Sequence, residues 1–504
     1  MSALRVPLSG TYNTRISDVA SLSSSSGVVG IGIVGSMVVG LSYRGSDKDQ
    51  RYINCLPVTV NEPITNTKKI YVVKRPGFAV NNTPASGNIG TAIHVWVAKG
   101  SGSDVISAFG STNSTIYNGT TSLGAITGKC NGITETVLSG TANLLMSSSD
   151  STAWYYPDGG ALTKISDVDY PGNAGKTTVG TFAHLDGYAF IMTSDGLIYG
   201  SDLNSITSWS ASNFVSANEY PDQGVGLVRF RNTILAFGKE SMEVYQNAGN
   251  AAGSPLSRLP GYSQLIGCIS ADAITSIKDT VFFCGATKQG SIGLYAYDGQ
   301  KATQVSPPEI NAQFTIAGPS NVTLTSMVFY GRHFVVCKAT NTTFVYCVEE
   351  ANWHEWSSTE PLWYKADGVS NGSTMVCYTL SNVSTSGKVF VFDPASTTYQ
   401  DNGSSFTAII QTSKLDLGNS LRKSWGKMNV VADQTTTTSN LSITWSDDDY
   451  QNYSSAVTVD LSGTHPNVSR TGSSRRRNWI LSHSANTSMR LEALDFPDIQ
   501  VGEI

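Results

Sequence analysis

Short runs of purely apolar residues recur along the middle of the chain at nearly constant spacing, separated by polar turns. A second kind of short run follows each of them and ends in an aromatic residue. The apolar runs are centred 41 to 53 residues apart, and the aromatic residues follow one another at 39 to 52 residues. The apolar runs occupy residues 93–97, 143–146, 188–192, 233–237, 280–283, 333–336 and 374–377. The aromatic residues are Tyr117, Tyr156, Tyr199, Tyr245, Tyr297, Tyr346 and Phe392.

An all-β repeat of this length is typical of one four-stranded blade of a β-propeller. A single such sheet has two faces to cover and two open edges, and blades packed around an axis cover the faces. The pattern therefore predicts an all-β fold with a six- or seven-bladed β-propeller. We expect the apolar run to be an inner strand packed on both faces. The more polar segments 208–214 and 396–403 are expected in outer strands or loops.

The period stops near residue 402, and the last hundred residues alternate between apolar and polar positions in runs 10–15 residues apart. This alternation predicts a C-terminal β-sandwich-like domain. The sequence thus predicts an N-terminal arm with strands (1–88), β-propeller repeats (89–402) and the sandwich-like domain (403–504). Within the arm, the Gly-rich apolar segment 27–41 is shorter than the ~20 residues of a membrane helix. We expect a buried strand or ordered arm there, and no stable membrane insertion.

Composition narrows the classes of protein that remain. Only 14% of the 504 residues are charged and 40% are hydrophobic, which excludes disordered tails and coiled coils. The net charge of -5 lacks the basic excess typical of nucleic-acid binders. The seven cysteines form no CxxC pair and are expected to be small buried apolar side chains. Because the first residues lack an apolar signal segment, we expect the chain to fold in a cytoplasm.

Three short segments have residue types that could carry binding chemistry. Residues 173–178 (NAGKTT) contain GKT without the spacing of a phosphate-binding loop, so a turn between strands is favoured. The acids Asp447, Asp448 and Asp449 could bind calcium, but their spacing favours a solvated hairpin turn. The basic run from Arg475 to Arg477 could contact DNA or an acidic neighbouring subunit, and a subunit contact or a loop is favoured.

Aromatic and histidine residues raise further alternatives. Trp353, Trp356 and Trp363 could form a sugar-stacking surface, although packing in an outer blade is favoured. His94 and His333 lie in apolar strands and are expected in the core or facing the propeller pore rather than on a metal. We assign no catalytic, cofactor-binding or metal-ligating residue, predict no cofactor, and do not expect an enzyme.

The order of several motifs resembles the packaged-DNA stabilisation proteins of short-tailed bacteriophages, also called tail hub or tail nozzle proteins. An opening Q-R-x-x-N-x-x-P element is followed by a P-G element. Residues 238–268 then resemble the family's middle stretch, in which a strand ending in E-x-[YF] leads into a loop of small residues. The C-terminal strands resemble its closing β-domain, and residues 27–47 look like an insertion. The first two elements are Gln50, Arg51, Asn54 and Pro57, then Pro76 and Gly77.

The resemblance implies a structural protein of the virion's short tail, assembled in the host cytoplasm. It implies a homo-hexameric tube below the portal and the head-to-tail adaptor ring, which retains packaged DNA and conducts it during ejection. Double-stranded DNA would pass transiently, without sequence-specific binding. The partners implied are tailspike or tail fibre proteins and a tail plug or needle.

Two other classes stay open. The first is a tail-associated propeller that binds or hydrolyses glycans, which would need two carboxylates converging in a cleft. The acids of the repeat instead lie mainly at turn-like places, as turn chemistry predicts. The second is a propeller scaffold of cellular origin that binds protein partners. The acids considered are Asp158, Asp186, Asp195, Asp202, Glu243 and Asp298.

Overall fold

The computed structural model falls into two compact units that interleave along the chain. The sandwich unit comprises Met1–Phe78, Glu350–Thr359 and Pro394–Ile504, and the propeller unit comprises Ala79–Glu349 and Glu360–Asp393. The structure describes residues 4–7, 50–61, 68–97, 103–110, 112–138, 140–250, 252–288, 290, 292–340, 342–358, 363, 365–370, 375–381, 387–417 and 419–502. The apolar segment 27–41 lies outside the described residues.

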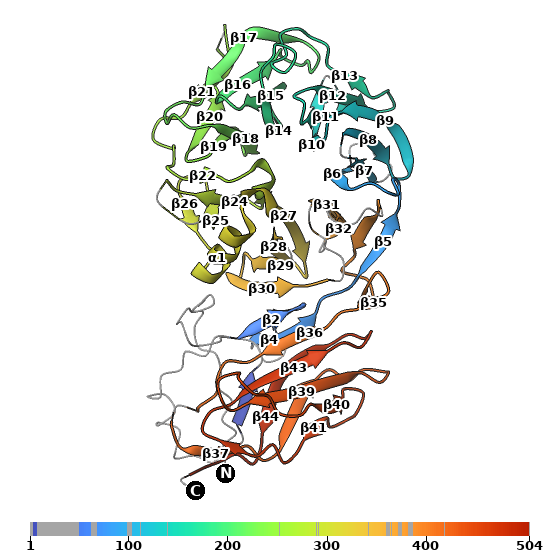
Figure 1. The fold of residues 1–504 in the computed structure, drawn as a ribbon, viewed down its shortest axis with the longest axis vertical. Coiled ribbons are helices and arrows are strands. Elements are labelled where there is room, and N and C mark those ends of the chain that lie inside the picture. The colour runs from blue at the N-terminus through green and yellow to red at the C-terminus, as the bar shows by residue number, and fades with distance from the viewer. Residues whose placement is uncertain are drawn as a thin grey trace. The chain divides into compact units, whose positions relative to one another are not determined.

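Seven sheets of the propeller unit follow one another around a common axis in the described part of the chain (Figure 1). Blade 1 is β6 (Gly90–Trp96), β7 (Asp104–Phe109), β8 (Asn113–Asn118) and β9 (Thr121–Thr127). Blade 2 is β10 (Cys130–Leu138), β11 (Thr141–Ser148), β12 (Ala153–Pro157) and β13 (Thr163–Lys164). Blade 3 is β14 (Thr178–Leu185), β15 (Tyr188–Thr193), β16 (Leu197–Ser201) and β17 (Trp209–Ser216). Blade 4 is β18 (Gly224–Phe230), β19 (Thr233–Gly238), β20 (Met242–Asn247) and β21 (Leu256–Arg258).

The remaining three blades depart from this regular pattern. In blade 5 a 3-10 turn divides the innermost strand into two, whereas the innermost strand of each other blade is a single strand. Blade 5 is β22 (Gly267–Cys268), η3 (Ala271–Ala273), β23 (Ile274–Ile277), β24 (Thr280–Ala286), β25 (Gly293–Tyr297) and β26 (Ala302–Gln304). After helix α1 (Pro308–Ala317) and turn η4 (Pro319–Asn321), blade 6 contributes β27 (Val322–Phe329), β28 (Arg332–Ala339) and β29 (Thr342–Cys347). Blade 7 is β31 (Lys365–Ser370), β32 (Met375–Leu380), β33 (Val389–Phe392) and β5 (Phe78–Asn82).

The ring closes in blade 7, whose outermost strand β5 comes from before blade 1 in the sequence. The innermost strand of blade 7, β31, also lies beside β6 of blade 1. A small apolar core seals this seam, in which Ile93 and Phe109 of blade 1 pack with Leu380 and Val389 of blade 7. Joining the two ends of the repeat in this way leaves the ring without a free break, which is how propellers protect their edges.

The aromatic landmark of the sequence falls in the third strand of every blade: β8, β12, β16, β20, β25, β29 and β33. Its physical role is visible in several ring contacts with the preceding blade. Tyr156 meets Trp96 with ring centroids 5.8 Å apart, and Phe392 meets Phe329 at the same centroid distance. Blades therefore adhere through buried rings, whose edge-to-face packing adds to the burial of apolar area. This confirms the predicted all-β propeller and selects seven blades from the predicted range of six or seven.

The apolar landmark needs one correction. In six copies it is the second strand of the blade, and in β15, for example, the consecutive residues Ala189 to Thr193 are all buried, as expected of a strand packed on both faces. In the first copy, residues 93–97 instead fall mainly in β6, the innermost strand. The reason is that the first and second strands of blade 1 are both apolar, so the repeating pattern alone does not show which of them is the second strand. The predicted outer strand at 208–214 is confirmed as part of β17.

The sandwich unit consists of two main sheets with a shared core. One sheet is β3 (Cys55–Asn61), β4 (Lys68–Lys74), β44 (Arg490–Phe496), β38 (Met428–Ala432) and β41 (Asn467–Val468), with β1 (Leu4–Pro7) on β44. The other is β30 (Asn352–Trp356), β2 (Arg51–Ile53), β36 (Ala408–Gln411), β43 (Asn478–His483), β39 (Asn440–Ser446) and β40 (Val457–Asp460). A hairpin, β34 (Gln400–Asp401) with β35 (Ser404–Ser405), and a small sheet, β42 (Ser473–Ser474), β37 (Arg422–Ser424) and β45 (Gln500–Gly502), complete it.

Alternating burial, as in β36 and β44, turns one side of each sheet toward a core that includes Trp425, Trp479 and Phe496. This packing of two sheets face to face is a β-sandwich. The compact units do not follow the predicted boundaries at 88/89 and 402/403, because β2 and β4 pair with the C-terminal strands β36 and β44, and β3 joins them through β4. Segment 396–403, expected in an outer strand or a loop, is a loop that leads into β34 and its turn, and it belongs to the sandwich unit. Among the described residues, no helix has the length and apolar character needed to cross a membrane.

Candidate functional sites: buried ion-pair clusters and the propeller axis

The motif residues near the N-terminus converge on one buried arginine of the sandwich unit. Arg75, just before the Pro76-Gly77 element, is fully buried and forms a bidentate ion pair with Asp401, with N–O distances of 2.7 and 2.9 Å. Its other donors reach the Asn54 side chain and the carbonyl oxygens of Pro76 and Ser357. All five guanidinium N–H groups thus have an acceptor, which is what allows a charged arginine to be buried.

The structure explains why two positions of the motif are asparagine and glycine, Asn54 and Gly77. Asn54 adopts a left-handed backbone (φ 55°), which asparagine tolerates better than most residues, and its amide also bonds the Thr407 carbonyl at 2.9 Å. A Cβ on Gly77 would lie 2.0 Å from the Gln400 carbonyl oxygen, so only glycine fits. Arg51 forms a second, more exposed bidentate pair with Glu355. The N-terminal motif therefore holds three separate chain segments together.

The E-x-Y element of the middle stretch has a similar structural role inside blade 4. Glu243 is 1% exposed and accepts hydrogen bonds from the Tyr245 hydroxyl at 2.8 Å and the Glu219 backbone at 2.9 Å. Burial, together with the Glu243 carboxylate, raises the pKa of Tyr245. Glu243 is thus an exception among the acids expected at turns. Asp186, Asp195 and Asp298 do lie in turns, where Asp298 for instance accepts two backbone N–H groups.

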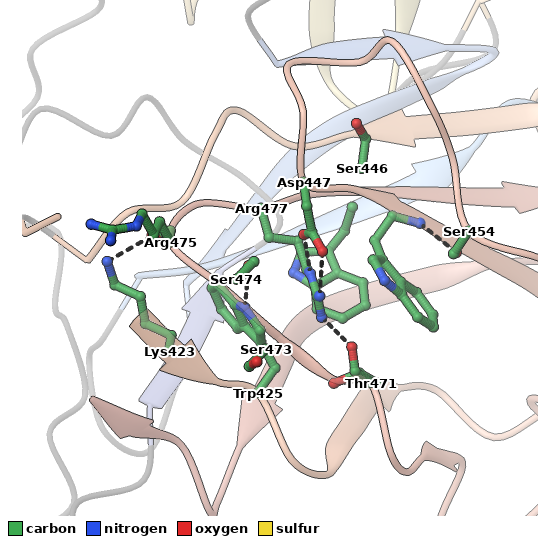
Figure 2. Close-up of polar contacts among 12 residues, drawn as sticks. Lys423, Trp425, Ser446, Asp447, Ser454, Thr471, Ser473, Ser474, Arg475 and Arg477 are labelled. Carbon is green, nitrogen blue, oxygen red and sulfur yellow. Dashed lines mark hydrogen bonds and ion pairs between the residues drawn. The ribbon is translucent and has the colours of Figure 1, made fainter. Parts of the chain in front are cut away.

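The acidic and basic runs singled out in the sequence pair with each other, which the sequence did not predict (Figure 2). Arg477 is 1% exposed, and its Nε and Nη2 atoms lie 2.6 and 2.8 Å from the Asp447 carboxylate. Its guanidinium carbon lies 5.3 to 5.5 Å from the ring centroids of Trp425, Trp445 and Trp479. The contact favours burial of the cation, because aromatic faces attract positive charge.

The other acids of the run are also engaged. Asp448 closes the turn after β39, and the Asn452 amide and backbone, with Ser446, lower the pKa of Asp448 to about 2. Asp449 pairs with Arg476 and with Lys414. This geometry is that of the favoured hairpin turn rather than of an open calcium loop. Arg476 and Arg477 are therefore used inside the unit, whereas Arg475 remains exposed.

The turn η3, which splits the inner strand of blade 5, contacts the inner strands of several other blades. An ideal Cβ on Gly180 of β14 would lie 3.5 Å from the Ala271 Cβ, and so would one on Gly226 of β18. At this distance a Cβ would make an ordinary van der Waals contact, so η3 packs directly against both inner strands. Asp272 of η3 pairs with Lys365 of β31, so the contact skips blade 6 and joins blades that are not neighbours. The turn η3 thus connects the inner strands of blades 3, 4 and 7.

A histidine at the ring seam links three blades. His94 of β6 has Nδ1 2.8 Å from Asp367 of β31 and Nε2 3.3 Å from Glu135 of β10. Burial lowers the pKa of His94, but the hydrogen bonds and charges of Asp367 and Glu135 outweigh it and the net shift is upward. With a carboxylate at each nitrogen, the doubly protonated ring makes both contacts. The expectation of a core or pore-facing histidine is met here, and His333 pairs with Glu349 at 2.6 Å.

The remaining candidates are structural. Trp353, Trp356 and Trp363 are 3 to 5% exposed, so none presents an open face to a sugar. Trp353 and Trp356 lie in β30, which follows β29 in the strand order of its sheet, so the favoured packing in an outer strand holds for both. The NAGKTT segment is a turn leading into β14, as favoured. All seven cysteines are buried and free, as expected.

The fold is thus a seven-bladed β-propeller joined to a β-sandwich, and the motif residues Asn54, Gly77 and Glu243 stabilise this fold. The chain belongs to the family described as Phage_stabilise: Bacteriophage P22 Gp10, beta-propeller, whose model matches residues 43–396. This confirms the resemblance seen in the sequence. The family is one of structural virion proteins, and the chain is accordingly a bacteriophage virion component.

Comparison with other known proteins adds little to this assignment. No curated protein sequence matches the chain. Among solved structures, the Raptor protein of Chaetomium thermophilum is similar with a TM-score of 0.41 at 12% identity, covering 64% of this chain and 29% of that one. The computationally designed Ika8 protein has a TM-score of 0.33 at 11% identity, covering 62% of this chain and 99% of that one.

Proposed function

We propose that this chain is a subunit of the tail nozzle, or hub, of a short-tailed bacteriophage. In this proposal several copies, six by resemblance to the family, form a tube below the portal and the adaptor ring. The tube retains packaged DNA and later conducts it, and it carries tailspikes or fibres and a plug or needle. The observation that carries the proposal is membership of the Phage_stabilise family across residues 43–396.

Contacts across the propeller ring support a conduit between subunits rather than through one propeller. The Lys365–Asp272 pair joins the inner parts of two blades that are not neighbours, whereas a DNA duplex has a major groove alone about 12 Å wide. A passage for the duplex would therefore be enclosed by several copies. The propeller itself would serve as a stiff wall, because its blades are joined by buried aromatic contacts and by the His94 cluster.

The charge of the chain suits transient passage of DNA. Phosphate affinity comes from lysine and arginine contacts that release counterions, and the net charge here is -5. An acidic polar wall would let a duplex slide without being held. The seven buried, free cysteines fit assembly in a reducing host cytoplasm.

The test uses particles made with and without this chain. We expect particles lacking the chain to package DNA and then lose it, as measured by nuclease sensitivity of the encapsidated genome. Immunogold labelling of complete particles should place the chain on a stub below the capsid. Full DNA retention without the chain, or gold only on fibres projecting sideways, would contradict the proposal and turn attention to glycan binding and hydrolysis.

A further inference from the structure

Two antiparallel segments of the sandwich unit form a strongly basic ribbon. We use the name basic ribbon for residues 420–427 together with 470–477. The Trp425 backbone N–H donates to the Gly472 carbonyl at 3.0 Å, and Lys423 of β37 stands opposite Ser474 of β42. The buried Trp425 ring and Arg477 fix the ribbon on the core of the unit (Figure 2).

The charge of the ribbon is opposite to that of the rest of the chain. Its sixteen residues contain seven of the chain's 33 lysines and arginines and no aspartate or glutamate. Without the ribbon, 26 basic and 38 acidic residues remain, a net charge of -12. The chain therefore carries a concentrated basic segment and a predominantly acidic remainder. The seven cations are Arg422, Lys423, Lys427, Arg470, Arg475, Arg476 and Arg477.

Only three of these cations are paired with an acid or buried inside the unit. Arg477 and Arg476 pair with Asp447 and Asp449, as described above. Lys423 is buried and donates to two backbone carbonyls, those of Asn419 and Arg475; burial lowers the pKa of Lys423. The other four cations are exposed, and within the described part of the chain none of them has an ion pair. These four are Arg422, Lys427, Arg470 and Arg475.

Two of the exposed arginines are held in place without being neutralised. The Arg422 Nε atom donates to the Ser473 hydroxyl at 3.0 Å, and an Nη atom of Arg475 donates to the Ser420 carbonyl, also at 3.0 Å. Both acceptors are neutral, so each guanidinium keeps its charge. Side chains ordered in advance lose less entropy on binding a partner.

Exposed apolar residues lie beside these cations. Leu421 of the ribbon is 37% exposed, and Val501 of β45, opposite Lys423 in the sheet, is 45% exposed. Arginine with apolar side chains is the composition of a protein–protein interface. A surface that contacts only DNA phosphates gains nothing from exposed leucine and valine. The observations thus favour an acidic protein surface over a nucleic acid.

We propose that the basic ribbon docks onto the acidic surface of a second copy of this chain. The contact joins the ribbon of one copy to a different, acidic region of the next and is therefore heterologous, the kind that generates rings when the rotation closes. The inference rests on the proposed function in so far as a nozzle needs such a ring. It names the surface that each subunit contributes.

The test is self-association of the purified full chain, followed by sedimentation equilibrium. We compare the wild type with Arg422→Glu/Arg475→Glu and with Lys427→Glu/Arg470→Glu. Each double change turns two attractions into repulsions, so we expect assembly to require about tenfold or more protein. Wild-type assembly should also weaken between about 0.01 M and about 1 M salt, where the Debye length falls from about 30 to about 3 Å.

The matched control is Lys164→Glu/Lys301→Glu, which changes the charge equally at two exposed positions of the propeller unit. It should assemble as the wild type does. Lys427 and Arg470 are exposed, and within the described residues their side chains make no hydrogen bond or ion pair. Their replacement therefore tests charge with little risk to folding, which unfolding temperatures will verify.

Three outcomes would overturn the proposal: a wild type that stays monomeric at all salt concentrations, ribbon variants that assemble normally, or a control that fails equally. Loss of binding to a short fluorescent DNA duplex, with self-association unchanged, would also overturn it and assign the ribbon to nucleic acid. These results are separate from the nozzle test. Particles lacking the chain can still lose their DNA when ribbon variants assemble normally, and only the ribbon proposal then fails.

Discussion

Replacing Asp401 by asparagine tests whether the Arg75 cluster stabilises the sandwich unit. Both side chains of the ion pair are at most 1% exposed. Asp401→Asn preserves shape and can still accept the Phe78 backbone N–H, but it leaves the Arg75 charge buried without its counter-ion. Breaking a buried pair in this way costs about 3–5 kcal/mol of unfolding free energy.

The same motif offers a matched exposed pair. Arg51 and Glu355 also form a bidentate contact, but their side chains are 48% and 26% exposed. Solvent screens such a pair, and we expect Glu355→Gln to cost less than about 1 kcal/mol. The difference between the two variants isolates burial, because charge type and geometry are shared.

The assay is denaturant unfolding of the full chain, followed by tryptophan fluorescence, with each unit's transition fitted separately. A double variant, Arg75→Met/Asp401→Leu, removes both charges and should recover part of the stability lost in Asp401→Asn. The reasoning is refuted if Asp401→Asn and Glu355→Gln lower the unfolding free energy of the sandwich unit equally. It is also refuted if the double variant is no more stable than Asp401→Asn.

Three further predictions concern the propeller seam, the P-G element and the cysteines. Because the net effect of its neighbours raises the folded pKa of His94 above the unfolded value of about 6.5, its protonated form stabilises the ring below that pH. This contribution is lost as pH rises through the folded pKa, so the stability gap between wild type and His94→Gln should shrink in urea titrations over that window; a constant gap would contradict the assignment. Gly77→Ala should cost about 1–3 kcal/mol or more, since its Cβ meets the Gln400 carbonyl, whereas Gly502→Ala, with open space around it, should be nearly neutral. Finally, the seven buried thiols should resist a thiol reagent in the native protein and all react after unfolding, because burial raises the pKa of several of them, to about 12 in Cys130; rapid native labelling would show that the core opens.

The propeller could be predicted from the sequence because its stabilising contacts repeat. A third-strand aromatic such as Tyr156 or Phe392 is needed wherever one blade packs on another, so the requirement recurs with the period of the fold. Blade 1 shows the limit of this reasoning. Its first two strands are both apolar, so the apolar pattern alone does not show which of them is the second strand of the blade. The run expected in the second strand therefore falls in β6, the first strand.

The clusters could not be predicted, because they join residues that are distant in the sequence. Arg75 and Asp401 are 326 positions apart, and Arg477 and Asp447 are 30 apart, next to different strands. A run of three acids and a run of three arginines each looked like a surface feature when read separately. Only the pairing of β39 with β43, the strands that these two runs adjoin, brings the runs together. The available signal in the sequence was that the same C-terminal all-β segment contains one run of three acids and one run of three arginines, which can pair with each other.

The position of the motif residues bears on where function should be sought. Asn54, Gly77 and Glu243, through which the family resemblance is recognised, all serve internal packing or hydrogen bonding. Such residues specify the fold, and a family sharing them can differ in every contact made outside the subunit. If the chain works by assembling with copies of itself and with other tail proteins, its specificity must reside in exposed residues rather than in these three. The basic ribbon is such a surface, since its inward face is anchored by Arg477 and its outward cations are left for a partner.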